Sequence, residues 1–507
     1  MQFPILTSIL LAPILGIIII FLLPATKEKE IKVTVVIVTF ISLLLSIIAF
    51  VTYDKAIGGL QFMETYSWIP AFGINYSVGV DGLSLPLVLL TSIVIFAGVF
   101  SSWKMEKRIK EFFIFLLLLV AGVFGVFISR DLFFFYVFFE IAVIPMYILI
   151  GVWGSTRKDY AAMKLTLYLL VGSAFILIGI IATFVYANKL GIRSFDIQTL
   201  STIEYSESFQ KFAFFLMLIG FGILVPMWPF HAWSPDGHVA APTAVSMLHA
   251  GVLMKLGGYG IIRIGVFLFP EGAKYWVPLI AVLSIANILY GAMVAMAQKD
   301  LKFVIGYSSV SHMGYVLLGI ASLNYKGIDG AVAQMFAHGI MTALFFTLIG
   351  NIYYQAHTRE IAKFGGLIHQ MPRVAIGFII AGFASLGLPG LANFVAEFLI
   401  FLGSHDQPRK LFSIIPFKAI SILAILGIVI TAAYILKVIQ DTFFGPRKKE
   451  WDHLQDAKGV EMIPIVMLAG VLIFFGLFPA PLIDLIHSGA ISLMGKISDA
   501  GMIMGGF

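Results

Sequence analysis

Long apolar stretches alternate with short polar ones along almost the whole chain of 507 residues. About 20 consecutive apolar residues are enough to cross a bilayer as a helix. Runs of this kind fall near residues 4–24, 32–53, 82–103, 111–128, 131–150, 161–187, 212–231, 241–266, 275–298, 302–322, 329–354, 373–403, 418–444 and 461–486. The pattern therefore predicts an all-α polytopic membrane protein with 14 transmembrane helices.

Two of these runs are interrupted. Pro226 and Pro229 break the seventh run, and the sequence Gly387-Leu388-Pro389-Gly390 breaks the twelfth, five helices later. A proline removes a backbone donor, so such a break survives in a bilayer only where protein or a water-filled cavity satisfies the freed groups. Interrupted helices at matching positions of two halves are typical of inverted repeats with a transport site.

The interruptions suggest four segments in the chain. Three helices and a polar, aromatic outer loop occupy residues 1–110, a first five-helix repeat occupies 111–270, a second and inverted five-helix repeat occupies 271–445, and a last helix and tail occupy 446–507.

The composition agrees with a membrane protein. The chain is 60% hydrophobic and only 12% charged, against about 25% charged for soluble domains. There is no cysteine, which excludes disulfides, thiolate metal sites and thiol catalysis. The net charge of +6 lies in short basic clusters between apolar runs, so it does not indicate nucleic-acid binding. Lys and Arg concentrate in the loops of one side, which favours both termini on the outer side.

Three ionisable residues lie deep within predicted spans: Glu140 in the fifth, Lys255 in the eighth and Glu397 in the twelfth. A charged residue at the centre of a bilayer costs at least about 2.5–3.5 kcal/mol, which makes each a candidate for an ion pathway. We interpret the carboxyl groups as proton-binding acids and Lys255 as a base that loads and releases a proton. The alternative is a structural ion pair, although Ser or Asn would serve that purpose at lower cost.

Buried histidines extend this set. His312 and His338 lie in consecutive predicted helices, and a neutral imidazole can hand a proton along a water chain. A single buried histidine is more often a satisfied core residue, but two beside buried Glu and Lys favour a relay. His249 is a weaker candidate, because it precedes Lys255 by six residues and faces another direction. Lys437 is also weaker, since a lysine near the end of a span can snorkel to water.

Other polar residues carry less information. His231 and His238 flank the turn WSPDGH and are expected to be turn or interface residues. A zinc site there is poorly supported, because the spacing does not suit one helical face and no third ligand is evident. We therefore expect no metal in this chain.

Four stretches of the sequence resemble a known family. They read PMWPFHAWSPDGHVAAPTAVSMLHAGVLMKLGGYG, DLKFVIGYSSVSHMGY, FAHGIMTALFF and SLGLPGLANFVAEF. They resemble the antiporter-like membrane subunits of respiratory complex I, and the similarity spans nearly the whole chain. The sequence SVSHMG, together with a glutamate in the twelfth helix, resembles the M type of bacterial NADH–quinone oxidoreductase, a relative of mitochondrial subunit 4, more than the L and N types.

The resemblance implies an inverted-repeat fold with a central hydrophilic axis. It further implies proton translocation driven by quinone reduction in another subunit, so that this chain would be a non-redox part of an enzyme. FMN, iron–sulfur clusters and quinone would belong to partner subunits. The expected partners are the L and N sisters in the lipid bilayer of a bacterial inner membrane, with both termini periplasmic.

The family's functional positions match residues already singled out. The resemblance implies that the fifth-helix glutamate, the eighth-helix lysine, the two relay histidines and the acid at the outlet correspond to Glu140, Lys255, His312, His338 and Glu397.

One position departs from the family. A lysine usually stands two residues before the first proline of the broken seventh helix, and here that residue is Leu224. The usual cationic partner of Glu140 is therefore missing. Two other functions stay open: a subunit of an Mrp-type cation/proton antiporter, which shares this architecture, and a structural spacer that no longer pumps.

Overall fold

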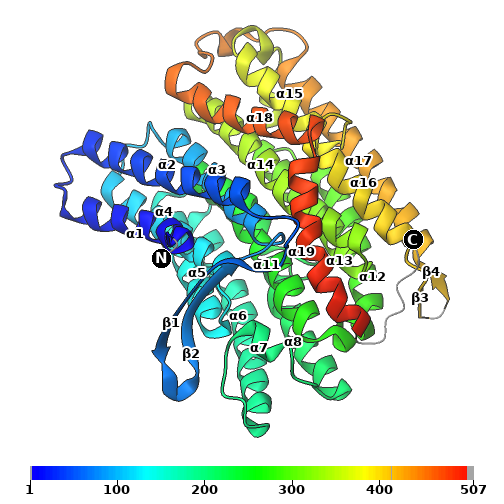
Figure 1. Ribbon diagram of the computed structural model, residues 1–507. Coiled ribbons are helices and arrows are strands. Elements are labelled where there is room, and N and C mark those ends of the chain that lie inside the picture. Colours follow the sequence, from blue (N-terminus) through cyan, green and yellow to red (C-terminus); the bar gives the residue numbers. More distant parts are fainter. Residues whose placement is uncertain (1–2, 413, 500–507) are drawn as a thin grey trace.

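The computed structural model describes residues 3–412 and 414–499, and nearly all of them belong to helices (Figure 1). The first half contains α1 (Ile5–Leu22), α2 (Glu28–Thr52), α3 (Leu85–Ser101), α4 (Ile109–Ile128), α5 (Leu132–Trp153), α6 (Lys158–Lys189), the short α7 (Ile197–Leu200), α8 (Glu207–Leu224), α9 (Trp233–Ala240), α10 (Thr243–Leu248) and α11 (Met254–Gly260). The second half contains α12 (Pro270–Met296), α13 (Leu301–Ala321), α14 (Tyr325–Ala356), α15 (Pro372–Ser385), α16 (Ala392–His405), α17 (Phe417–Phe443), α18 (Met462–Leu477) and α19 (Ala480–Asp499).

Within the described residues, 12 helical segments are long and apolar enough to cross a membrane. The polytopic, all-helical architecture predicted from the pattern is therefore confirmed. The number 14 stays a prediction, because the third predicted span corresponds to a helix of 17 residues and the twelfth to the two short helices α15 and α16.

The predicted spans and the helices differ at the C-terminal end. The run 461–486 is not one helix, since α18 stops at Leu477 and α19 starts at Ala480. Pro479 lies between them, and proline disfavours helical conformation at the residue before it. The predicted tail, in which no further span was expected, contributes most of α19, up to Asp499.

The polar, aromatic outer loop predicted between the second and third spans, residues 54–81, contains a two-stranded antiparallel hairpin, β1 (Gln61–Ile69) and β2 (Ile74–Val80). A second, very short pair joins β3 (Lys410–Leu411) and β4 (Ile415–Pro416). The first hairpin is fastened to α5, because the carboxylate of Asp131, the N-cap residue of that helix, accepts a hydrogen bond from Asn75 N at 3.2 Å.

Both predicted breaks are present. The first lies between α8 and α9, where the side chain of Asn287 on α12 satisfies the freed backbone: Oδ1 accepts from Trp228 N at 2.5 Å, and Nδ2 donates to Pro226 O at 3.0 Å. The second lies between α15 and α16, where Gly387 and Gly390 have φ of 62° and 94°. Both values lie in the left-handed region that glycine adopts without strain.

The helices that contain the polar residues are the most enclosed ones. In the segment Thr243–Val266, which includes α10 and α11, and in helix α14, an apolar stretch of 18 residues is buried completely. In α13, 89% of such a stretch is buried. In α1 and α2, only 44% and 39% of the corresponding apolar stretch of 18 residues is buried. Figure 1 shows α13 and α14 in the middle of the molecule, with α1, α2 and α4 on one side and α15–α17 on the other.

Candidate functional site

The candidate site is a set of buried polar side chains that begins at Lys255. This residue is fully buried on α11, between two π-helical stretches at His249–Leu253 and Ile261–Val266. π-Helical turns are rare and are frequent at functional sites. The ammonium Nζ lies 2.8 Å from Nδ1 of His338 and donates a second hydrogen bond to the carbonyl of Ala250.

Two glycines explain why Lys255 and His338 meet. A Cβ on Gly339 would lie 2.5 Å from the carbonyl oxygen of Gly251, and a Cβ on Gly251 would lie 3.2 Å from that of Gly339. The π-helical stretch and α14 therefore touch backbone to backbone at this point. This approach brings Lys255, one turn after Gly251, within hydrogen-bond distance of His338, which directly precedes Gly339.

The path continues from His338 through His312 to Glu397. The ring centroids of the two histidines are 5.2 Å apart. His312 Nδ1 lies 3.4 Å from Glu397 Oε1, and its Nε2 lies 3.1 Å from Ser385 Oγ. All three side chains are at most 3% exposed.

Gln334 completes the connection. Its Nε2 donates to Glu397 Oε1 at 3.3 Å and lies 3.2 Å from His312 Nδ1. A Cβ on Gly330, one turn earlier on α14, would lie 2.7 Å from the backbone N of Ile400, so α14 and α16 are in close contact beside this amide. The five side chains from Lys255 to Glu397 thus form one buried polar path, in which the step from His338 to His312 is a ring-to-ring contact without a hydrogen bond between described atoms.

Sequence reasoning did not identify Gln334 or Ser385. A usable signal existed for Gln334, since it precedes His338 by four residues and therefore lies on the same helical face. Ser385 had no comparable signal, because its contact depends on where α15 ends beside the second break.

The second break adjoins the acidic end of this path. A Cβ on Gly387 would lie 2.5 Å from Glu397 Oε2, so the glycine leaves the space that the carboxylate occupies. The backbone interruption and the acid are thus parts of one local arrangement.

Glu140 lies apart from the path. It is half-buried on α5, its Oε1 has no hydrogen-bond partner, and no ion pair among the described residues joins it to Lys255. Leu224 is 1% exposed at the end of α8, and its carbonyl carbon would lie 3.1 Å from a Cβ on Gly257, two residues beyond Lys255. Position 224 thus adjoins the turn that follows Lys255, although leucine offers no charge there.

The two weaker candidates occupy different environments. His249 is fully buried and makes no hydrogen bond to Lys255. Lys437 is exposed on α17, away from the buried path. The described part of the chain contains no group of three or more His, Cys, Asp or Glu side chains that could hold a metal ion.

The path has the elements required for proton transfer. It joins a base, two imidazoles and a carboxylic acid through contacts of 2.8–3.4 Å, with one ring-to-ring step between the imidazoles. Each imidazole can accept a proton on one nitrogen and release another from the second. The enclosing helices exclude solvent, which strengthens every electrostatic interaction along it.

Two sequence comparisons with known proteins match most of this chain. The family model described as NADH:quinone oxidoreductase/Mrp antiporter, TM, matches residues 129–431. The chain is 38% identical over 510 residues to the NADH-quinone oxidoreductase subunit M of Rickettsia bellii (strain RML369-C), covering 98% of this chain and 99% of that protein.

Solved structures give a similar result. A chain of the respiratory complex I from Thermus thermophilus with bound NADH superposes with a TM-score of 0.88 at 29% identity, covering 97% of this chain and 99% of that one. A chain of the Mrp complex from Dietzia sp. DQ12-45-1b superposes with a TM-score of 0.84 at 20% identity, covering 98% and 100%. At that lower identity the similarity concerns the fold alone.

Proposed function

The chain belongs to the NADH:quinone oxidoreductase/Mrp antiporter transmembrane family, and on this basis we propose that it is a proton-translocating membrane-arm subunit of a NADH–quinone oxidoreductase. The observation that supports this most directly is the buried path from Lys255 through His338, His312 and Gln334 to Glu397. A purely structural interior would be built more cheaply from apolar residues.

In the proposed mechanism, Lys255 releases a proton to Nδ1 of His338, which lies 2.8 Å from its Nζ. His338 passes a proton to His312, and His312 delivers it to the carboxylate of Glu397. Gln334 holds the last two groups in register without being ionised itself.

Electrostatics permits a distant charge to drive this transfer. Two unit charges about 4 Å apart interact by about 4 kcal/mol at an effective dielectric constant of about 20. That energy corresponds to a factor of about a thousand in proton affinity. A change of charge next to Lys255 is therefore large enough to switch it between loaded and unloaded states.

Glu140 is the proposed source of a change of charge, because it is an acid in the same repeat, although no ion pair among the described residues joins it to Lys255. Leu224 removes the lysine that would couple Glu140 to the interior in related subunits. Replacing Leu224 by lysine is therefore a test of the spacer alternative. Two results together would support the spacer function. Lys255→Met would leave the number of protons moved unchanged in the parent protein, and Leu224→Lys would increase that number.

The chemistry of the enzyme is proposed to lie elsewhere. FMN, iron–sulfur clusters and quinone would be held by partner subunits, since this chain has no cysteine to ligate iron. The proposed neighbours are the L and N sisters, in a bacterial inner membrane with both termini periplasmic. The two inverted five-helix repeats, 111–270 and 271–445, would surround the path.

The alternative is an Mrp-type antiporter subunit that exchanges sodium for protons without an electron donor. The family description includes this function. The identity of 38% to a subunit M, against 20% to the Mrp chain, favours the oxidoreductase.

Affinity purification of the chain from its native membrane in mild detergent distinguishes the two. We expect co-purified flavin and iron–sulfur clusters, and NADH oxidation that depends on quinone. A set of purely membrane-embedded partners that moves sodium without NADH would contradict the proposal and favour the antiporter.

A further inference from the structure

A small cavity outside the buried polar path lies where the β1–β2 hairpin meets the start of α5. Its volume is about 20 Å³, and among the described residues its polar lining comes from Ser129, Arg130, Gln198, Tyr259 and Arg263. Gln198 is exposed, so the cavity lies close to the surface. About 10–15 Å³ is enough to hold one water. The cavity therefore has room for a water-sized particle or a monatomic ion, and not for a larger ligand.

Two hydrogen-bond donors at this cavity have no partner within the described residues. Ser129 is 4% exposed and its Oγ makes no hydrogen bond, and Nε of Arg130 makes none either. The other two nitrogens of Arg130 are occupied, since Nη1 donates to Met63 Sδ at 3.0 Å and Nη2 donates to Asp196 Oδ2 at 3.5 Å. Buried polar groups are almost always hydrogen-bonded. The two remaining donors therefore indicate a ligand that accepts hydrogen bonds.

The hairpin and α7 fix Arg130 in this place. A Cβ on Gly79 of β2 would lie 2.7 Å from Cδ of Arg130, so the glycine leaves the space that the arginine side chain occupies. The backbone of Arg130 is held on both sides, because its N donates to Ser77 O at 2.9 Å and its O accepts from Ile197 N at 2.8 Å. The arginine is thus positioned at the cavity by segments that lie far apart in the sequence.

Arg263 brings a second guanidinium to the same cavity. Its Nε donates to the hydroxyl of Tyr259 at 3.2 Å, and its Nη2 forms an ion pair with the carboxylate of Asp81. The hydroxyl of Tyr259 in turn donates to Phe127 O at 3.4 Å, so its proton is already used. Among the described residues that line the cavity there are two arginines and no acidic side chain. The lining therefore favours negative charge.

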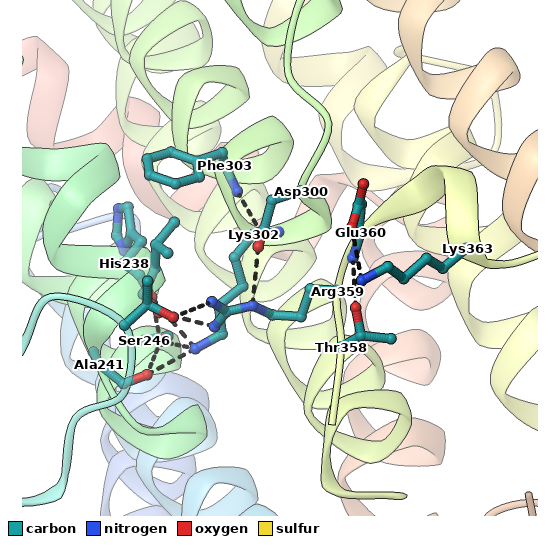
Figure 2. Close-up of polar contacts among 12 residues, drawn as sticks. His238, Ala241, Ser246, Asp300, Lys302, Phe303, Thr358, Arg359, Glu360 and Lys363 are labelled. Atoms are coloured by element: carbon teal, nitrogen blue, oxygen red, sulfur yellow. Dashed lines mark hydrogen bonds and ion pairs between the residues drawn. The ribbon is translucent and has the colours of Figure 1, made fainter. Parts of the chain in front are cut away.

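Arg359 shows how the same chain satisfies a buried guanidinium without a ligand. Figure 2 shows its Nε beside Asp300, whose Oδ2 accepts from it at 3.1 Å. Its Nη1 donates to Val239 O at 3.0 Å, and its Nη2 donates to Thr156 Oγ1 at 3.2 Å. All three nitrogens thus have an acceptor in the protein, whereas Nε of Arg130 lacks one. The missing acceptor is a feature of the cavity and not of buried arginines in this chain.

The unpartnered groups suit an anion better than a water. Of the two, only the Ser129 hydroxyl can also accept a hydrogen bond. A water bound to both groups would therefore keep at least one of its own hydrogens without an acceptor there. A halide ion only accepts, and it is attracted by both guanidinium charges. Apolar neighbours in the lining, Leu60 and Phe267, lower the local dielectric constant and so strengthen that attraction.

We propose that this cavity binds one chloride ion, held by Arg130 Nε, Ser129 Oγ and the guanidinium of Arg263. The ion would fasten the β1–β2 hairpin to the start of α5 and to the π-helical stretch Ile261–Val266. This inference goes beyond the proposed function and does not depend on it, because none of the three residues belongs to the buried polar path.

The test measures hydrogen exchange of the hairpin amides between Gln61 and Val80 in the intact, detergent-solubilised complex. Chloride is exchanged for gluconate, which is too large for the cavity, at constant ionic strength. A ligand that binds only the closed hairpin increases its protection by the factor 1 + [Cl⁻]/Kd. We therefore expect protection to rise about tenfold at a chloride concentration of about nine times the dissociation constant.

Ser129→Ala and Ser77→Ala form a matched pair, since both serines are 4% exposed. Ser129→Ala removes a hydroxyl without a partner in the protein, so it should match the wild type in gluconate and lose most of the protection gained in chloride. Ser77→Ala removes a hairpin hydroxyl that lies 3.1 Å from Thr65 Oγ1. It should lower protection equally in both salts and keep the full chloride dependence. Arg130→Gln should remove the chloride dependence.

A second measurement needs no variant. Bromide replaces chloride in crystals of the wild-type complex, and its anomalous scattering locates the bound ion. We expect one anomalous peak in the cavity beside Arg130 and Ser129. No peak at this position would contradict the proposal.

Three results of the exchange experiment would also overturn it. Protection that does not change with chloride in the wild type would mean that water fills the cavity. Equal chloride dependence in the wild type, Ser129→Ala and Arg130→Gln would place the effect of the ion elsewhere. A loss of protection in Ser129→Ala that is as large in gluconate as in chloride would leave the hydroxyl with a structural role only. None of these results bears on the proposed proton path, which Lys255→Met tests separately.

Discussion

At the scale of single residues, glycines decide where the polar groups meet. Gly251 and Gly339 let two helices touch so that Lys255 reaches His338, and Gly330 does the same for Gln334 and Glu397 beside it. The ionisable residues stand out in the sequence because they are rare in apolar runs. The glycine contacts do not stand out in the sequence, because many glycines occur in these helices. Only the packing shows which of them bring helices together.

Gly387→Ala is expected to disturb the acidic end of the path specifically. Alanine at a φ of 62° costs about 1–2 kcal/mol, and its Cβ would lie 2.5 Å from Glu397 Oε2, so the carboxylate must move away from His312. Proton translocation per NADH oxidised should fall, measured in vesicles that contain the complex.

Gly390→Ala is the matched control. It has the same kind of left-handed backbone, with a φ of 94°, but its Cβ would meet only Leu477 Cδ2 at 3.7 Å. It should cost similar stability and leave translocation unchanged. Equal losses of translocation in the two variants would contradict the role assigned to the Glu397 carboxylate.

At the scale of elements, interrupted helices and caps hold the site in place. The breaks themselves were predicted from Pro226, Pro229 and the Gly-Leu-Pro-Gly sequence, and the structure confirms both. Their partners could not be predicted in the same way. Asn287 lies 61 residues from Pro226 in sequence, and only the packing of α12 against the break shows that its amide satisfies the backbone. The hairpin β1–β2 was not predicted either, because its polar and aromatic residues indicate only an outer loop.

Asn287→Leu is expected to destabilise the first break. The variant leaves Trp228 N and Pro226 O unpaired in the interior, and each unsatisfied buried group costs about 1–3 kcal/mol. We expect faster hydrogen exchange across α9 and a lower melting temperature of the detergent-solubilised complex. Unchanged exchange at α9 would show that other groups satisfy the break.

The attachment of the β1–β2 hairpin should depend on pH through Asp131. Its carboxylate accepts hydrogen bonds from Asn75, Phe133 and Phe134, and burial raises its pKa from 3.8 to about 6. The folded state thus holds this proton more tightly than the unfolded one. The contribution to stability is fully present below the ordinary pKa and is lost as the pH rises through about 6.

Hydrogen exchange of the hairpin amides, corrected for the intrinsic effect of pH, measures this dependence. Protection should fall between about pH 4 and about pH 6 and stay level above that range. Asp131→Asn keeps an acceptor for the cap but cannot ionise, so the decrease should disappear. A decrease of the same size in Asp131→Asn would show that another group is responsible.

At the scale of the whole molecule, one buried polar path joins α11 in the first half of the chain to α16 in the second half. The sequence was sufficient to single out its ionisable members, Lys255, His312, His338 and Glu397, because ionisable residues are rare inside the apolar runs. It was not sufficient to order them, since Lys255 and His338 are 83 residues apart and meet only through tertiary packing. Glu140 remains a prediction, as it lies outside the contacts that join the other four.

The most direct test of the account is the number of protons moved per NADH oxidised by the intact complex when Lys255 is replaced by methionine. Methionine matches the length of the lysine stem and cannot hold a proton. The account predicts a complex that still assembles and oxidises NADH but moves fewer protons, with the same reduced ratio in Glu397→Gln and in the double variant. An unchanged ratio in the assembled Lys255→Met complex would contradict the claim that this path conducts protons.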